Sequence, residues 1–430
     1  MLRLRAILAA LMLGAPLAAS AAEITRVASS LDEDDPFDLF IDVNFERTQG
    51  REKITREQLA PAGAEAGRTD VGEVWHKSTD SRLNLRLAIG LYKDLELSFG
   101  LPLILQQNDS YDFVSGTTPA NSTIVRNCVN PDGTVTDPDC ASTGTGEKGL
   151  FTVPSTSKRG GLGNMHFGMA YAFFNQQRDD TKPTWVVGID YEAPTAKLRD
   201  PSEDNTGDER GNVGDRVHKY TFYTALSRKM GVAEPYFKVS YTLPVQGPGI
   251  YSNCFNRDQL GRPENCFQGP WTRKETGIQA PQTGGFLFGT EFNAFNDKNK
   301  NQKFTIDLRA IANYVGEGRY YNELSAGLGK LLATQDYLQV GGQLGAVASA
   351  GEAFTLRASG TFFYNTEHTL TNESIGKDLD GNGGVDLNDV GQPSPEVNPN
   401  FDFRTDLVSR RFRATEAKTF RLELSASFAF

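Results

Sequence analysis

The chain ends in the segment Thr419-Phe-Arg-Leu-Glu-Leu-Ser-Ala-Ser-Phe-Ala-Phe430, which decides the fold class. One parity of this segment carries only apolar residues: Phe420, Leu422, Leu424, Ala426, Phe428 and Phe430. The other parity carries the polar residues Arg421, Glu423, Ser425 and Ser427. A period of two with one apolar and one polar face predicts a β-strand. The terminal aromatic residue, with apolar residues in register behind it, indicates the closing strand of a transmembrane β-barrel.

The same alternation recurs along the whole chain and predicts an all-β protein, a transmembrane antiparallel up-and-down β-barrel. We expect strands at about residues 37–47, 82–92, 95–105, 162–173, 184–193, 219–228, 236–243, 285–295, 304–315, 337–348, 354–365 and 416–430. Residues 320–332 would make a thirteenth strand, but a single-chain bacterial barrel with both termini in the periplasm needs an even number. We therefore assign 316–336 to a loop with a short helix within 322–332. About twelve strands are expected, with fourteen as the alternative.

The connections between these strands are of two kinds. Those after every second strand are short turns, beginning with Tyr92-Lys-Asp94. The others are long, at about residues 48–81, 106–161, 194–218, 244–284, 316–336 and 366–415. Outer-membrane barrels have tight turns in the periplasm and long loops outside the cell, so the connections independently favour a barrel with long extracellular loops.

Residues 1–22 have the pattern of a secretory signal peptide. A short basic region is followed by an apolar stretch at 6–17 and by small residues at 18–22. The apolar stretch is too short for a spanning helix. We expect the mature chain to begin near Ala22 or Glu23, with a short periplasmic segment at 23–36 and one barrel domain at 37–430. The expected location is the outer membrane of a Gram-negative cell, with lipid and the barrel assembly machinery as partners.

The composition suits a barrel better than a soluble protein. A hydrophobic fraction of 38% and a mean hydropathy of -0.42 are low for a membrane protein. Only alternate residues of a barrel strand face lipid, however, and the loops and lumen stay polar. The net charge of -10 argues against a nucleic-acid partner.

All four cysteines fall in predicted outer loops, where Cys128 precedes Cys140 and Cys254 precedes Cys266. Four cysteines allow three pairings, and an exported chain meets an oxidising compartment. Because each pair shares one loop, we expect two local disulfide bonds. A metal or redox site is the alternative, but neither pair has CxxC spacing and no histidine is close in sequence.

The segment Asp378-Leu-Asp-Gly-Asn-Gly-Gly-Val-Asp-Leu-Asn-Asp389 resembles the calcium loops of EF-hand and dockerin proteins. A glycine stands at the obligatory turn position, and the ligand positions hold Asp378, Asp380, Asn382, Gly384 (through its carbonyl), Asp386 and Asp389. The segment departs from the usual EF-hand because an aspartate replaces the glutamate at the last position. We expect one structural Ca²⁺ outside the cell; the alternative is a solvated acidic loop without a ligand.

Charged residues gather on the parity that faces the lumen. The lumen-lining candidates are Asp42, Arg82, Arg86, Asp190, Glu291, Asp307, Arg309, Arg357, Arg421 and Glu423. Twelve strands enclose more space than an eight-stranded barrel that side chains fill, and less than a sixteen-stranded porin. The charges therefore either pair across the lumen and partly plug it, or line a narrow watery path for a small solute.

Three short motifs carry a family resemblance: Gly90-Leu-Tyr-Lys-Asp-Leu-Glu-Leu-Ser-Phe-Gly-Leu-Pro102, Gly161-Leu-Gly-Asn-Met-His-Phe-Gly168 and Tyr191-Glu-Ala-Pro-Thr195. On these motifs the first half of the barrel resembles the outer-membrane transporters of the phenol meta-cleavage pathway. Asn164 replaces the usual Asp of that family, and Ala196 replaces its Gly after Pro-Thr. The resemblance implies passive or facilitated uptake of small solutes, including aromatic or other hydrophobic compounds.

The sequence thus favours an outer-membrane channel or transporter for small solutes. A structural or surface-interaction barrel, with calcium-braced and disulfide-pinned loops, is the alternative. An outer-membrane enzyme is the third class and is disfavoured, because the four histidines are scattered and no catalytic triad can be assembled from spacing.

Overall fold

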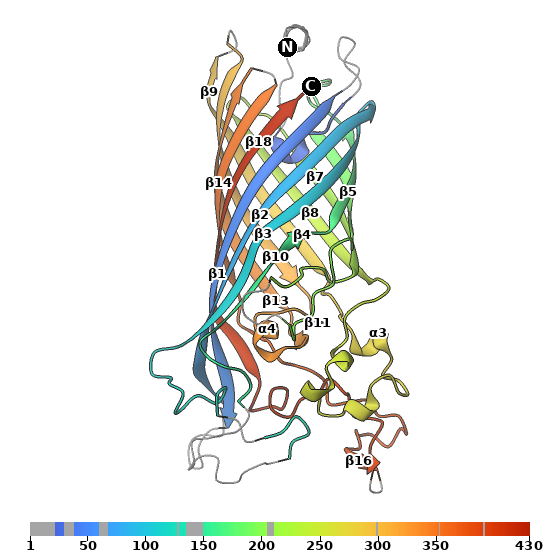
Figure 1. Cartoon of the computed structure of the whole chain (residues 1–430). Coiled ribbons are helices and arrows are strands. Elements are labelled where there is room, and N and C mark those ends of the chain that lie inside the picture. The colour runs from blue at the N-terminus through green and yellow to red at the C-terminus, as the bar shows by residue number, and fades with distance from the viewer. Residues whose placement is uncertain are drawn as a thin grey trace, which may run out of the picture.

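Twelve strands close into an antiparallel barrel within the part of the chain that the structure describes (Figure 1). This computed structural model describes residues 22–29, 38–59, 68–126, 129–134, 149–203, 210–297, 300–351, 353–389 and 392–430. The barrel strands are β1 (Leu39–Leu59), β2 (Arg68–Tyr92), β3 (Leu95–Phe113), β5 (Met165–Phe174), β6 (Thr184–Ala193), β7 (Val217–Ser227), β8 (Ala233–Gln246), β9 (Thr283–Asp297), β10 (Gln302–Val315), β13 (Tyr337–Ala350), β14 (Phe354–Asn365) and β18 (Phe412–Ala429). The predicted all-β barrel of about twelve strands is confirmed.

The last strand closes the barrel. β18 pairs with β14 on one side and with β1 on the other, so the first and last strands form the seam. At the end of the seam the backbone N–H of Leu39 donates to the carbonyl of Phe430, and the N–H of Phe430 donates to the carbonyl of Leu39, both at 2.9 Å. The terminal aromatic residue is therefore part of the closure itself.

The outer surface of the barrel is apolar. Large side chains of alternate residues point away from the lumen, and Leu344 and Phe288 are 60% and 51% exposed. Such a band is unfavourable in water and matches the hydrocarbon region of a bilayer. A closed barrel leaves no unpaired strand edge in lipid. The chain is an outer-membrane barrel, as predicted. Among the described helices, none has the length and apolar character needed to cross a membrane.

Two short strands join the barrel without adding to its ring. β4 (Ser155–Leu162) and β5 both pair with β3, and only Gly163 and Asn164 separate them. The predicted fourth strand, at 162–173, therefore corresponds to β5, and β4 extends the same wall toward the loops. β15 (His368–Thr369) pairs with the outer part of β18.

The first three strands extend far beyond their predicted ends. β1 and β2 pair from Leu39↔Ile89 through Leu59↔Arg68, and β3 continues to Phe113. The loop predicted at 48–81 is therefore wrong over most of its length. Alternation of apolar and polar residues marks only the part of a strand that faces lipid. Beyond the bilayer both faces meet polar surroundings, so the sequence loses the pattern although the strand goes on.

The long loops gather at one end of the barrel, opposite the end where β18 finishes (Figure 1). The predicted helix within 322–332 is confirmed as α4 (Ser325–Leu328), which lies between the paired β11 (Gly318–Tyr320) and β12 (Leu332–Thr334). The other short elements of these loops are η2 (Asn253–Phe255), η3 (Arg257–Gln259), η4 (Pro263–Asn265), α3 (Arg273–Thr276), β16 (Asn388–Asp389) and β17 (Gln392–Pro393).

Candidate functional site: the lumen and its two closures

Residues 22–29 lie inside the barrel near its periplasmic end, where η1 (Glu23–Thr25) forms one turn (Figure 1). Hydrogen bonds tie this segment to different strands: Thr25 Oγ1 to Ser227 Oγ of β7 (2.8 Å), Ala28 N to Glu96 Oε2 of β3 (2.8 Å) and Arg26 Nη2 to Ser427 Oγ of β18 (3.0 Å). A side chain at Gly90 would bring its Cβ within 2.7 Å of the Ser29 carbonyl oxygen, so the wall is shaped to admit the segment. We call residues 22–29 the lumenal segment.

The acidic side chain of the lumenal segment fits between two arginines of the wall. Glu23 Oε2 lies 3.2 Å from Arg309 Nη2 and also contacts Arg357 Nη2. Asp307 is fully buried beneath them, with Oδ2 2.7 Å from Arg309 Nε and 3.1 Å from Arg357 Nη1. Glu291 Oε1 accepts the backbone N–H of Glu23 at 3.1 Å. Four predicted lumen residues of β9, β10 and β14 thus form one network that the lumenal segment completes.

A second network holds the other end of the lumenal segment. Arg86 on β2 donates to Asp42 on β1 at 3.0 Å, because the strand register places them side by side, and it also contacts Glu96. Arg26 lies 3.7 Å from the other oxygen of Asp42. Both predicted residues of this network, Asp42 and Arg86, are therefore engaged at the periplasmic end.

The remaining predicted lumen residues follow farther along the wall. Arg82 bonds to Asp80 at 2.6 Å and lies 3.9 Å from Glu46, which is 3.5 Å from Arg421. Glu423 accepts the hydroxyl of Ser359 at 3.1 Å. Asp190 on β6 forms no ion pair with any described residue. Most of the wall charges thus pair with a neighbour, as the first of the two sequence interpretations supposes.

A cavity of about 200 Å³ lies farther out, where the outer loops meet the inner wall. Its lining mixes both signs of charge and includes Glu52, His76, Asp109, Arg159, Arg199 and Glu323. The two ring nitrogens of His76 face Glu52 Oε1 at 2.5 Å and Asp109 Oδ1 at 3.0 Å. Two carboxylate acceptors require the ring to donate from both nitrogens, so this histidine has no lone pair to offer as a base. The sequence missed this cluster because His76 and Asp109 fall in predicted loops.

An apolar core lies at the outer end of the barrel, between the extended strands and the loops. Its buried members come from the extended strands and from three loops: Ile54, Val74, Tyr111, Ile124, Leu324, Leu328, Leu332, Leu370, Phe412 and Ala414. Tyr111 also donates its hydroxyl to the carbonyl of Glu323 at 2.7 Å. We call this the outer core. It gives the loops a packed interior of their own above the bilayer.

Buried charges accompany the outer core. Lys330 and Arg404 bind Asp402 at 2.6 and 2.9 Å, and together they outweigh burial and lower its pKa to about 2. Burial raises the pKa of Asp406 to about 7, and Asp402 and Glu373 add to the rise against the opposing charge of Lys330. Burial likewise raises the pKa of Glu323 to about 7, with Glu52 adding to the rise.

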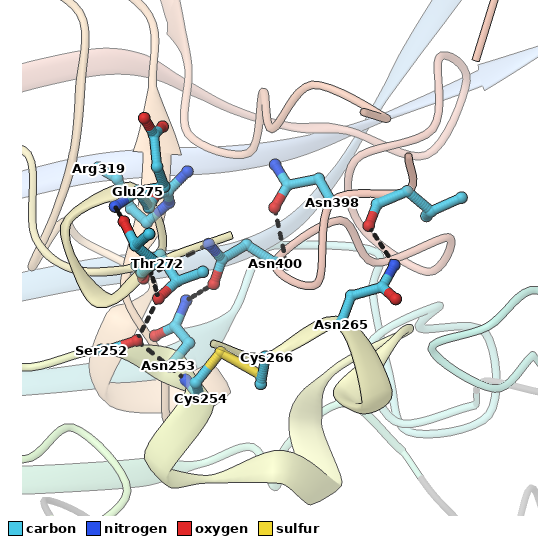
Figure 2. The surroundings of a disulfide bond; sticks show 12 residues. Ser252, Asn253, Cys254, Asn265, Cys266, Thr272, Glu275, Arg319, Asn398 and Asn400 are labelled. Atoms are coloured by element: carbon cyan, nitrogen blue, oxygen red, sulfur yellow. Dashed lines mark hydrogen bonds between the residues drawn. A yellow bond between two sulfur atoms is a disulfide. The ribbon is translucent and has the colours of Figure 1, made fainter. Parts of the chain in front are cut away.

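The predicted bond between Cys254 and Cys266 is present and fixes the loop that holds η2, η3 and η4 (Figure 2). Asn265, next to Cys266, donates to the carbonyls of Ser394 and Val397 at 2.8 and 2.7 Å. Trp271 Nε1 donates to the carbonyl of Pro395 at 2.7 Å. Asn265 within the disulfide-bonded loop and Trp271 just after it therefore both bind the stretch 394–397.

The other predicted cysteine pair, Cys128 and Cys140, lies outside the described residues. The Cys254–Cys266 pair is buried in the loop assembly, so the bond belongs to the interior of the loops and not to their surface.

The acidic segment 378–389 forms a compact loop beside residue 396. Asp378 Oδ1 and Oδ2 accept the backbone N–H groups of Gly381 and Gly383, which lowers the pKa of Asp378. Carboxylate oxygens of Asp378, Asp380 and the buried Glu396 all lie within 4.8 Å of one another. Glu396 was missed from the sequence because it lies downstream of the motif.

The other predicted ligand positions lie in the same loop. Asn382 Nδ2 donates to Asp380 Oδ2 at 3.1 Å and to Asp386 Oδ2 at 3.2 Å. Gly384 N–H donates to Asn382 Oδ1 at 3.0 Å. Asp389 lies in β16, and its side chain is outside what is described. Clustered hard oxygen atoms of this kind suit Ca²⁺.

Comparisons with known proteins find only distant similarities. No family model and no curated protein matches the chain. Among solved structures, an outer membrane channel from Pseudomonas putida F1 is 10% identical, with 90% of this chain and 95% of that one covered and a TM-score of 0.42. A Pseudomonas aeruginosa FadL homologue is 9% identical over 91% and 90% of the two chains, with a TM-score of 0.35. The outer membrane protease OmpT from Escherichia coli is 8% identical over 91% and 97%, with a TM-score of 0.28. Such distant similarities carry no argument about activity. The function is therefore inferred from the residues of the lumen.

Proposed function

We propose that the protein is an outer-membrane channel for passive or facilitated uptake of small solutes. One observation carries the proposal: at the periplasmic end the short lumenal segment lies inside the barrel and is held to the wall by ion pairs and hydrogen bonds. Glu23 between Arg309 and Arg357 is the central contact. A barrel that only displays its loops has no need of a polar lumen with an exchangeable closure, since inward-facing side chains can fill such a space with an apolar core.

The charged wall supports passage of a hydrated solute. Water and ions can replace the partners of the more exposed lumenal ion pairs, such as Arg86 with Asp42, at small net cost, because exposed or half-exposed pairs are each worth about 0–1 kcal/mol. An apolar constriction would instead exclude water. For the class of solute we propose small compounds, including aromatic or other hydrophobic ones, on the strength of the sequence resemblance alone.

Single-channel recording tests this function. The refolded protein and a variant that lacks residues 22–29 are compared in a planar bilayer. We expect the variant to pass a larger and steadier current, which candidate aromatic solutes reduce by occupying the lumen. The full-length protein with Leu344→Ala, an alteration on the lipid face, serves as the control. Silence of both proteins at all voltages would reject the channel.

A structural or surface-interaction barrel is the second candidate. It is favoured by the outer core, which gives the loops an interior of their own. Silent barrels in the recording, together with binding of the loops to a surface partner, would establish this role. An enzyme finds no support in the His76 cluster, because both ring nitrogens are committed to carboxylates.

We further propose that the loop 378–389 binds one structural Ca²⁺. Asp378, Asp380, Asn382, Asp386 and the Gly384 carbonyl would supply oxygen ligands, with Glu396 as an additional one. The carboxylate oxygens of Glu396 accept hydrogen bonds from the N–H groups of Leu379, Asp380 and Asp386. Glu396 therefore stabilises the conformation of the loop whether or not it also ligates the ion. Extracellular calcium sites work at about 0.1–1 mM, so a modest affinity would suffice.

Calorimetry with Ca²⁺ tests the site. We expect one ion per chain for the unaltered protein and none for the double variant Asp378→Ala, Asp380→Ala, with barrel assembly unchanged. The matched control is Asp132→Ala, which removes a half-buried aspartate from another outer loop. Absence of heat at several millimolar Ca²⁺ would leave the segment as an acidic loop only.

A further inference from the structure

The backbone nitrogen of Ala22 is bound by a buried carboxylate. Ala22 N lies 2.6 Å from Glu234 Oε1, and neither residue is more than 2% exposed. The same oxygen accepts the hydroxyl of Ser227 at 3.0 Å. Glu234 belongs to β8, so this contact joins the start of the lumenal segment to the barrel wall.

Glu234 has no cation at ion-pair distance, although Lys303 interacts with it at longer range. Among the described residues it forms no ion pair with any lysine or arginine, although its neighbours Glu291 and Asp307 both have arginine partners. A buried carboxylate that meets only neutral donors is costly, because the desolvation of the charge is not offset. An ammonium group at Ala22 N would supply the missing charge and turn the short contact into a charge-assisted hydrogen bond.

The sequence offers two positions for signal peptide removal, before Ala22 and before Glu23, since small residues stand at the required places for both. The structure distinguishes them. Removal before Glu23 would delete the contact with Glu234 and leave that carboxylate with Ser227 alone. It would also delete the carbonyl of Ala22, which accepts the N–H of Thr25 at 2.9 Å and its hydroxyl at 3.1 Å and so closes η1.

We propose that the mature protein begins at Ala22 and that Glu234 is the binding site for its α-ammonium group. A signal peptidase hydrolyses the amide bond before Ala22. Water adds to the carbonyl of Ala21, the C–N bond breaks, Ala21 leaves as a carboxylate, and the freed amine of Ala22 takes up a proton. The resulting ammonium pairs with Glu234 inside the barrel.

This pairing links export to closure of the lumen. In the precursor, Ala22 N is an amide and offers one neutral hydrogen. After cleavage the same atom carries a full positive charge and three hydrogens, so the lumenal segment is held by charge at its first residue as well as at Glu23. The segment therefore binds the wall more tightly in the processed protein than in the precursor.

The first test is the mass of the N-terminal peptide of protein extracted from outer membranes. We expect the mature chain to start at Ala22. A start at Glu23, or a mixture dominated by it, would overturn the proposal.

The second test measures how fast the α-amine of the folded protein reacts in reductive methylation, with exposed lysines as internal standards. A bound ammonium reacts only when the segment opens, so we expect labelling at least about tenfold slower than in the heat-unfolded protein. Glu234→Gln should accelerate labelling, whereas Glu264→Gln, at an exposed glutamate of the outer loops, should not.

An insertion keeps the test valid if Glu234→Gln impairs assembly. One Gly inserted between Ala21 and Ala22 moves the ammonium one residue away while Glu234 stays intact. We expect this α-amine to react as fast as in Glu234→Gln, with normal heat-modifiable migration of the barrel. Equal labelling rates in the folded unaltered protein and in either variant would contradict the pairing.

Discussion

The two ends of the barrel are held together by different contacts. At the periplasmic end, residues 22–29 bind the wall through charged side chains such as Glu23 and Arg26. At the outer end, loops pack around apolar residues such as Leu324 and Phe412, which are fully buried. Water and ions compete directly for the polar contacts, whereas the apolar contacts are lost only if the whole core opens. We therefore expect the contacts of residues 22–29 with the wall to break and re-form readily, and the outer core to stay packed.

The largest effect is expected from Leu324→Ala in the outer core. Truncation of a fully buried leucine leaves a cavity and typically costs about 2–5 kcal/mol. We expect limited proteolysis of the outer loops to become much faster while the barrel stays folded. Leu344→Ala, on the lipid face of β13, is the matched control and should change nothing. Unaltered proteolysis would show that the loops do not depend on the outer core.

Removal of the disulfide bond sharpens the view of the outer closure. The double variant Cys254→Ser, Cys266→Ser should lose about 2–3 kcal/mol of local loop stability. Because Asn265 and Trp271 hold the stretch 394–397, hydrogen exchange should accelerate there and in residues 378–386. Exchange in the barrel strands should not change. Equal exchange rates in 394–397 with and without the disulfide bond would show that the bond does not stabilise this stretch or the neighbouring loop 378–389.

Glu23→Gln addresses the periplasmic closure. The amide cannot balance Arg309 and Arg357, and loss of a hydrogen bond to charged groups costs about 1–3 kcal/mol. We expect single-channel recordings to show more frequent opening. The difference from the unaltered protein should shrink between about 0.1 M and about 1 M salt, because salt screens the native ion pairs. An opening frequency equal to that of Glu264→Gln would mean that Glu23 does not hold the segment.

The smallest predicted effect is a pH dependence of the outer closure. The pKa values of Glu323 and Asp406 are raised to about 7 in the folded loops, so the folded state binds more protons than the open one between about pH 4 and pH 7. Their contribution to stability is complete below about pH 4 and is lost as the pH rises through 7. We expect loop proteolysis, with a protease active across the range, to be at least about tenfold faster at pH 8 than at pH 5.

Asp406→Asn should reduce this pH dependence, whereas Asp132→Asn should leave it unchanged. Proteolysis that slows as the pH rises would contradict the assignment.

The sequence was sufficient for the parts of the fold that lipid constrains. The alternation of apolar and polar residues in Leu95–Phe99 or Phe420–Leu424 arises because one face of each strand contacts hydrocarbon. The need for an even number of strands excludes a barrel strand at 320–332. The alternation is lost beyond the bilayer. For this reason the predicted first strand ends near residue 47, whereas β1 continues to Leu59.

The site was less accessible to sequence reasoning. Parity identified Asp307 and Arg357 as inward-facing, but nothing local indicated that Glu23 would bind both arginines or that Glu396 would approach Asp378. Such contacts join residues far apart in the chain, and a single sequence carries no record of them. The buried pair of Lys330 and Asp402 is of the same kind, since each looks like an ordinary surface charge until the loops pack.

The seam between Leu39 and Phe430 has a consequence for the order of events in biogenesis. The first strand leaves the ribosome long before its partner β18, the last of the described barrel strands, exists. Until then one edge of β1 exposes backbone groups that lipid cannot satisfy. The ring can therefore be completed only after β18 has been synthesised. A nonsense mutation upstream of β18 would cost the cell the entire barrel and not merely one strand.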